Sequence, residues 1–118
     1  MLPTQQPLET KVRFQEGQAI LDMNGEINGL CEEVLQKAYS EVSTLGAKSI
    51  VLNFSDVIYI NSTGIALIVG LLAQARKSHI PVITYGLSDH YLEIFRVTRL
   101  ADFMAIVPDE QSALARAG

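Results

Sequence analysis

The N-terminal part of the chain contains two short segments in which apolar and polar residues partly alternate. They are Lys11–Phe14 and Gln18–Met23, and the pair Glu16 and Gly17 separates them. Alternation with a period of two is typical of a β-strand, and a glycine-containing pair between two such segments favours a tight turn. The pattern predicts a β-hairpin. A flexible tail is expected before it, over residues 1–10, where prolines and glutamines break any periodicity.

The next segment has the periodicity of a helix. Its apolar positions recur at intervals of three and four residues and end before Gly46; they are Leu30, Val34, Leu35, Ala38, Tyr39, Val42 and Leu45. This spacing predicts an amphipathic helix. Ser49–Phe54 follows as an apolar run of strand-forming residues bounded by polar ones. Such a run predicts a central strand that is covered on both faces.

The rest of the chain alternates between helical and strand patterns. The expected elements are a helix from about Ser62 or Thr63 to Ser78, a buried strand at Val82–Tyr85, a helix capped by Ser88 or Asp89 and ending near Val97, a short strand at Ala105–Val107, and a final helix opening near Pro108 and Asp109. Parallel neighbouring strands need helical crossovers, whereas the hairpin supplies an antiparallel edge. The prediction is therefore an α/β fold, with a mixed four- to five-stranded sheet, an N-terminal hairpin and four flanking helices, in a single domain over residues 1–118.

Composition and charge narrow the range of functions. The chain has 13 acidic and 9 basic residues, a net charge of −4, and no cluster of Lys or Arg that could neutralise a run of phosphates. Direct nucleic-acid binding is therefore not expected. Cys31 is the single cysteine, and the N-terminus resembles neither a signal peptide nor an anchor, which predicts a cytoplasmic protein. The longest apolar run, Ile65–Ala73, is too short to cross a bilayer, so membrane insertion is not expected.

Three segments carry a resemblance to a known family. They are Phe54–Ile65, which includes Asn-Ser-Thr-Gly, the upstream Gly-Glu-Ile-Asn at Gly25–Asn28, and the downstream segment Ile94–Leu100. With them the chain resembles the STAS family, which includes the anti-sigma factor antagonists, over roughly Lys11 to Leu114. In that family a strand-loop-helix junction reads Asp-Ser-Ser/Thr-Gly before an apolar helix, and the serine after the Asp is the phosphoacceptor.

The resemblance implies which residues form the site. It makes Ser62 the phosphoacceptor, with Thr63 as the alternate, and the expected partner-binding residues are Asn28, Asn61, Ser62, Thr63 and Gly64. Asn61 stands where the family usually has Asp, and Asn28 stands where the family often has a second Asp. Losing two carboxylates reduces repulsion of a phosphate, but it also removes anions that could interact with the metal-bound nucleotide of a kinase.

A serine at the start of a helix has a physical interpretation of its own. Its hydroxyl projects outward beside the partly positive backbone N–H groups of the first turn. A phosphate there adds about −1.5 to −2 charge and can exclude a partner without unfolding the domain. The alternative is that Ser62 and Thr63 only cap the helix, which contributes roughly 0.5–2 kcal/mol of stability.

Three functional hypotheses follow. The first, implied by the resemblance, is a phospho-switch that binds a regulatory serine kinase or anti-sigma factor, releases it when Ser62 is phosphorylated, and is reset by a PP2C-type phosphatase. The second is a constitutive STAS-type scaffold or accessory subunit of a sensory or transport complex. The third is a nucleotide-binding protein, although the sequence lacks a phosphate-cradling glycine loop after a strand.

An enzyme, a metal site and a cofactor are not expected. The sequence contains no Ser-His-Asp order, HExxH, P-loop or GxGxxG, and neither His79 nor His90 lies near a candidate nucleophile. Most of the apolar run Ile65–Ala73 is expected in the core, with any exposed part available for docking. Arg96 and Arg99 are candidates for holding an acidic partner surface.

Overall fold

The computed structural model describes residues 6–116. Its strands are β1 (Glu9–Gln15), β2 (Gln18–Ile27), β3 (Ser49–Ile60), β4 (Val82–Tyr85) and β5 (Ala105–Ile106). Its α-helices are α1 (Glu32–Thr44), α2 (Ser62–Lys77), α3 (Asp89–Val97) and α4 (Glu110–Ala115), and two short 3-10 helices are η1 (Gly29–Cys31) and η2 (Leu100–Phe103).

The strands form one mixed sheet in the order β1-β2-β3-β4-β5. β1 and β2 pair antiparallel, and the turn between them uses Glu16 and Gly17 at φ values of 54° and 83°. Glycine adopts such left-handed backbone without strain, which explains its place in the turn. The later neighbours are parallel, so α1, α2 and α3 serve as crossovers between them. The predicted hairpin and α/β architecture are confirmed.

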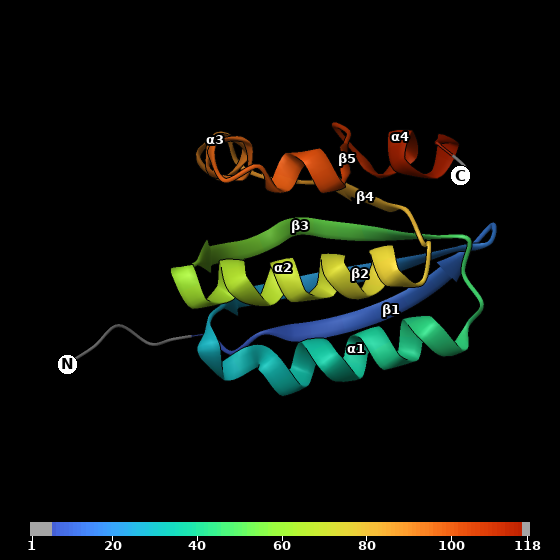
Figure 1. Cartoon of the computed structure of the whole chain (residues 1–118), viewed down its shortest axis with the longest axis horizontal. Coiled ribbons are helices and arrows are strands. Elements are labelled where there is room, and N and C mark those ends of the chain that lie inside the picture. The colour runs from blue at the N-terminus through green and yellow to red at the C-terminus, as the bar shows by residue number, and fades with distance from the viewer. Residues whose placement is uncertain (1–5, 117–118) are drawn as a thin grey trace.

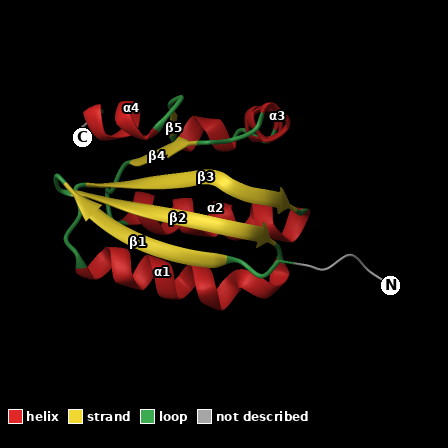
Figure 2. Ribbon diagram, turned by 180° about the vertical axis from the view of Figure 1, so that it is seen from behind, coloured by secondary structure: helices red, strands yellow, loops and turns green. Residues whose placement is uncertain are grey.

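The helices cover the two faces of the sheet unequally. α1 and α2 lie side by side across one face, as the views from opposite sides in Figures 1 and 2 show. Their apolar faces bury side chains such as Leu35 and Ile68 against the strands. α3 adds Phe95, whose ring meets that of Phe54 edge-on with the centroids 5.7 Å apart. On the opposite face α4 packs Ala113 into a smaller apolar cluster.

β3 is longer than the sequence pattern predicts. It was expected to end at Phe54, but it runs for 12 residues to Ile60. Its second half pairs with β2, up to Ile27 opposite Ile60, through two register shifts. Gly25 lies beside one of these shifts with φ of 117°, a backbone conformation that side chains disfavour. The extension carries the chain past the end of β4 to the start of α2.

Other expectations near the N-terminus need correction. The expected flexible tail, residues 1–10, overlaps β1, which begins at Glu9, and Leu8 is buried in the core. Residues 1–5 lie outside the described residues. Leu30, expected on the buried face of the first helix, lies in η1 before α1 and is 83% exposed. Within residues 6–116, the helices are all too short or too polar to cross a membrane.

A polar cluster fastens α4 to the sheet. The Arg13 guanidinium donates hydrogen bonds to Asp22, at 2.7 and 2.9 Å, and to Glu110, at 2.6 and 3.2 Å. The Tyr85 hydroxyl donates to Glu110 at 2.7 Å, and the Asn53 amide donates to Asp22 at 2.8 Å. The cluster therefore links four strands to the last helix.

This cluster predicts a loss of stability in acid. Burial opposes ionisation of Asp22, but hydrogen bonds from Arg13 and Asn53 outweigh it and lower the pKa of that carboxyl. Hydrogen bonds from Arg13 and Tyr85 lower the pKa of Glu110. Because the folded state binds these protons less tightly, the stabilisation is full above the unfolded-chain carboxyl pKa of about 4 and is lost as the pH falls below it.

Chemical unfolding at a series of pH values checks this expectation. The free energy of unfolding should decline from pH 7 to pH 3 in the wild type. Glu110→Gln should reduce it by about 1 kcal/mol at pH 7 and flatten the decline, because one of the two carboxylates no longer titrates. An equal decline in variant and wild type would show that Glu110 does not contribute.

Candidate functional site

The first turn of α2 presents the predicted phosphoacceptor, and Asn61 caps it. Asn61 has an extended backbone, and its side-chain oxygen accepts a hydrogen bond from the Gly64 amide at 2.8 Å. Ser62 is the first helical residue, and both Ser62 and Thr63 are exposed. The alternative in which these two residues cap the helix is therefore wrong. Because Asn61 performs that role, the Ser62 hydroxyl is not used for capping.

Gly64 allows the first turn of α2 to pack directly on the end of β2. A Cβ atom on Gly64 would overlap the backbone carbonyl of Ile27. The same carbonyl accepts a hydrogen bond from the Asn61 N–H at 3.2 Å. Gly64 was expected to contact a partner, but it is buried. Its contribution is to set the distance between α2 and β2.

Asn28 brings the segment after β2 into the same site. Its side-chain oxygen caps η1 by accepting from the Leu30 amide at 2.9 Å, and its own amide donates to Glu26 at 3.4 Å. A Cβ atom on the next residue, Gly29, would lie 3.2 Å from the Thr63 side chain. The two segments therefore lie side by side, and the structure gathers all five predicted site residues.

The two asparagines of the site, Asn28 and Asn61, hold these segments in place. An aspartate could cap either helical turn equally well. At position 28, however, it would lack the amide that donates to Glu26, and it would bring two carboxylates together. Glu26 thus supplies an acid beside the site, two residues before Asn28.

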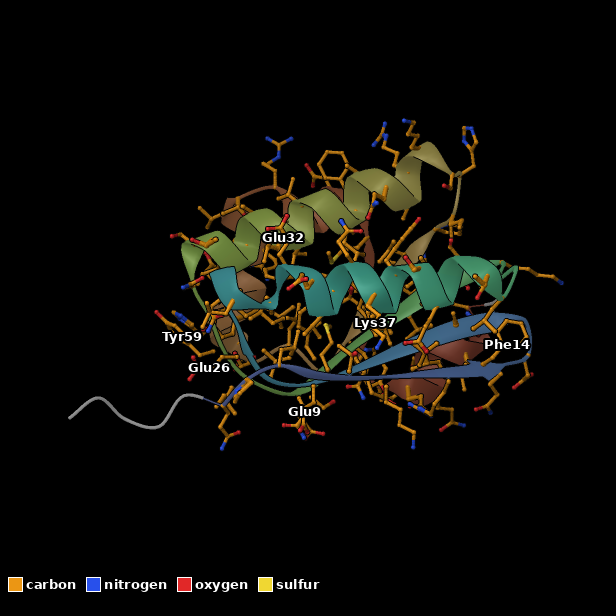
Figure 3. The ribbon with its side chains drawn as sticks, turned by 90° about the horizontal axis from the view of Figure 1, so that it is seen from below. Glu9, Phe14, Glu26, Glu32, Lys37 and Tyr59 are labelled. Atoms are coloured by element: carbon orange, nitrogen blue, oxygen red, sulfur yellow. The ribbon has the colours of Figure 1, made fainter. Side chains whose placement is uncertain are left out.

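Exposed apolar side chains lie at the same end of the molecule. Leu30 is 83% exposed, Ile58 is 57% exposed and Tyr59 is 52% exposed. Tyr59 is the β3 neighbour of Glu26 on β2, and Figure 3 shows these two side chains together at the end opposite Phe14. Ile58 and Tyr59 are consecutive residues of β3 and point to opposite faces of the sheet, so this end of the molecule exposes apolar groups on more than one side, where a partner protein can contact them. Sequence patterning did not single out any of the three as part of the site.

The charges that the site's own segments contribute are acidic. Residues 14–36 and 49–75, which build it, contain no Lys or Arg. Glu26 lies beside Asn28, and Glu32 and Glu33 occupy the first turn of α1, where carboxylates interact favourably with the helix dipole. Figure 3 shows Glu32 at the start of that helix. These segments offer a partner neutral hydroxyls and apolar groups beside carboxylates.

Tyr91 anchors the strand that leads into the site. From α3, its buried hydroxyl accepts a hydrogen bond from the Ile60 amide at 2.8 Å and donates one to the Ile60 carbonyl at 3.4 Å. Ile60 directly precedes Asn61, so α3 fixes the backbone from which the acceptor turn starts. Sequence analysis missed this residue, because a contact across 31 positions leaves no local pattern.

Two further reactive side chains, His90 and Cys31, make structural contacts. The His90 ring packs edge-on against Tyr91 with the centroids 4.8 Å apart. Cys31 is buried and its thiol donates to the Asn28 carbonyl at 3.0 Å, and burial raises the pKa of the thiol. Over the described part of the chain, no three His, Cys, Asp or Glu side chains gather in a group that could hold a metal ion.

A mixed sheet with a strand-loop-helix junction that exposes a serine is the arrangement expected of the STAS fold. The STAS domain family model matches residues 9–113, and the chain therefore belongs to this family. A curated relative is the anti-sigma-B factor antagonist of Staphylococcus aureus (strain NCTC 8325), which is 27% identical over 97 residues, covering 82% of this chain and 86% of the relative.

Solved structures show the same fold. An anti-sigma factor antagonist from Mycobacterium paratuberculosis superposes with a TM-score of 0.74 at 19% identity, covering 93% of each chain. The Bacillus cell fate determinant SpoIIAA in its phosphorylated form superposes with a TM-score of 0.70 at 19% identity, covering 93% of this chain and 100% of SpoIIAA. The predicted resemblance to the STAS family is confirmed.

Proposed function

We propose that this protein is an anti-sigma factor antagonist controlled by phosphorylation of Ser62. In its unphosphorylated form it binds a regulatory serine kinase that acts as the anti-sigma factor. Phosphorylation releases the kinase, and a PP2C-type phosphatase resets the cycle. The observation that carries the proposal is the exposed Ser62 hydroxyl at the first position of α2, which Asn61 leaves free of capping. The curated relatives named as anti-sigma-B factor antagonists support the same role.

The chemistry belongs to the partner, and this chain supplies the acceptor. The Ser62 hydroxyl attacks the γ-phosphorus of ATP, its proton passes to a base of the kinase, and the bond to ADP breaks. The turn is suited to this role because hydrogen bonds hold its backbone on both sides of Ser62, to Ile27 and to Asn61. A rigid acceptor reduces the entropy lost on reaching the reactive geometry.

Release follows from the surroundings of the acceptor. Before phosphorylation a partner covers a neutral hydroxyl and the exposed apolar side chains Leu30 and Tyr59. After phosphorylation the same contact must desolvate a dianion. The phosphates of the ADP that remains on the kinase also repel this dianion. Both effects favour dissociation without a change of fold.

Capture with a non-phosphorylatable bait tests the proposal. Ser62→Ala protein should retain a serine kinase from a lysate of the source cells. The purified kinase with ATP should then add one phosphate to wild-type protein, and mass spectrometry should place it on Ser62. Thr63→Ala serves as the matched control and should be phosphorylated like the wild type. Phosphate on neither hydroxyl would refute the switch.

A constitutive scaffold is the second candidate, and the replacement of both family acids by Asn28 and Asn61 favours it. Asn61→Asp separates the two candidates. If the protein is a kinase substrate, a carboxylate next to Ser62 can help position the metal-bound nucleotide, and we expect the phosphorylation rate to rise on the order of tenfold. Thermal unfolding should be unchanged, because Asp caps as well as Asn. If neither the wild type nor the Asn61→Asp variant is phosphorylated, the result would support the scaffold.

A further inference from the structure

Three hollows meet at an exposed aromatic residue far from Ser62. Phe103, at the end of η2, is 52% exposed and lines hollows of about 270, 390 and 580 Å³. α2 forms one wall with Leu72 and Arg76, and β4 and β5 form another with Val82 and Ala105. We call this region the Phe103 surface. Arg76 comes 14 residues after Ser62 on α2, about 21 Å along the helix, so both regions can be occupied at once.

The Phe103 surface has an excess of positive charge. The Arg76 guanidinium lies over the Phe103 ring, 5.3 Å from its centroid, and Arg116 lines the largest hollow. The acidic neighbour Asp102 already accepts a hydrogen bond from Arg99 at 2.7 Å. Arg76 and Arg116 have no salt bridge with any residue between positions 6 and 116. Arg76 lines the two smaller hollows and Arg116 lines the largest, so the cations on either side of Phe103 are complementary to carboxylates that flank an apolar side chain.

The same surface contains the end of the sheet. β5 has two residues, it pairs with β4, and it is last in the strand order of the described residues. Figures 1 and 2 show β4, β5 and α4 together along this edge of the sheet. The outer side of β5 can therefore pair with one further extended segment, whose alternate side chains would face the hollows.

We propose that the Phe103 surface binds an extended acidic segment of a partner protein, which adds to the sheet beside β5. A large apolar side chain of that segment packs on Phe103, and its carboxylates pair with Arg76 and Arg116. A second copy of this chain fits less well, because joining two Phe103 surfaces would bring these cations together. The interaction is independent of the phosphorylation of Ser62.

Fluorescence anisotropy with two labelled peptides tests the proposal. The probe is a short peptide of alternating Glu and Val with a central Phe, and its partner has Lys in place of Glu. The full chain should bind the acidic peptide, and Arg76→Glu should weaken binding by about tenfold or more. Lys48→Glu changes the net charge equally at an exposed site outside the Phe103 surface and should bind like the wild type. Amide NMR shifts should change at Phe103 and Ala105 and not at Ser62.

Several results would overturn the proposal. These are no binding of the acidic peptide, equal binding of the lysine peptide, equal losses in Arg76→Glu and Lys48→Glu, or shifts centred on Ser62. Sedimentation velocity tests the remaining possible occupant, a second copy of this chain. Concentration-dependent dimers that Arg76→Glu strengthens would assign the Phe103 surface to a second copy instead.

Discussion

Ser62→Asp is expected to weaken binding of the anti-sigma kinase on the order of 100-fold, whereas Ser62→Ala should bind as tightly as the wild type. The carboxylate takes the place of a neutral hydroxyl that the partner covers, and burying an unpaired charge costs several kcal/mol. Stability should not fall, because an acid at the first position of α2 interacts favourably with the helix dipole. Isothermal titration calorimetry with the purified kinase measures both affinities.

Ser43→Asp provides the matched control for charge. Ser43 is exposed near the end of α1, so this variant has the same net charge as Ser62→Asp with the acid away from the acceptor. It should bind the kinase like the wild type. If both variants lose affinity equally, the effect comes from net charge, and if neither does, Ser62 lies outside the interface.

Gly64→Ala is expected to destabilise the protein by roughly 3 kcal/mol or more. The added methyl group would overlap the Ile27 backbone carbonyl, and backbone cannot move aside as a flexible side chain can. Relief requires α2 to move away from β2, which strains the hydrogen bond between Asn61 and Ile27. Urea unfolding followed by circular dichroism gives the change in free energy.

Gly70→Ala is the internal control for that experiment. Gly70 lies on the same helix, and a Cβ there meets nothing within 4 Å. Alanine should therefore stabilise the protein by about 0.5–1 kcal/mol, since it has the higher helix propensity. A Gly64→Ala protein as stable as the wild type would mean that α2 does not pack as closely on β2 as described.

Local patterns predicted the elements that local interactions determine. The hairpin, the amphipathic α1 and the strand Val82–Tyr85 follow from periodicity and turn chemistry within a few residues. The second half of β3 was missed because side chains on both faces of the strand, such as Ile58 and Tyr59, are exposed there. Its pairing depends on β2, which lies far away in sequence.

The resemblance predicted which residues form the site, but only the structure shows how they are held together. The resemblance pointed to Ser62 and to the two asparagines, and the structure brings these residues together. Sequence analysis considered only Ser62 and Thr63 as caps, because both are good cap residues, and the capping role of Asn61 came from the structure. Leu30 fitted the helical period, yet η1 precedes α1 and turns this side chain to solvent.

Affinity measured on one preparation before and after phosphorylation tests the switch most directly. Wild-type protein is titrated with its kinase in the presence of ADP, converted fully to the form with one phosphate on Ser62, and titrated again. A PP2C-type phosphatase then removes the phosphate for a third titration. The proposed function predicts tight binding, a loss on the order of 100-fold, and full recovery. Equal affinity in all three titrations would contradict it.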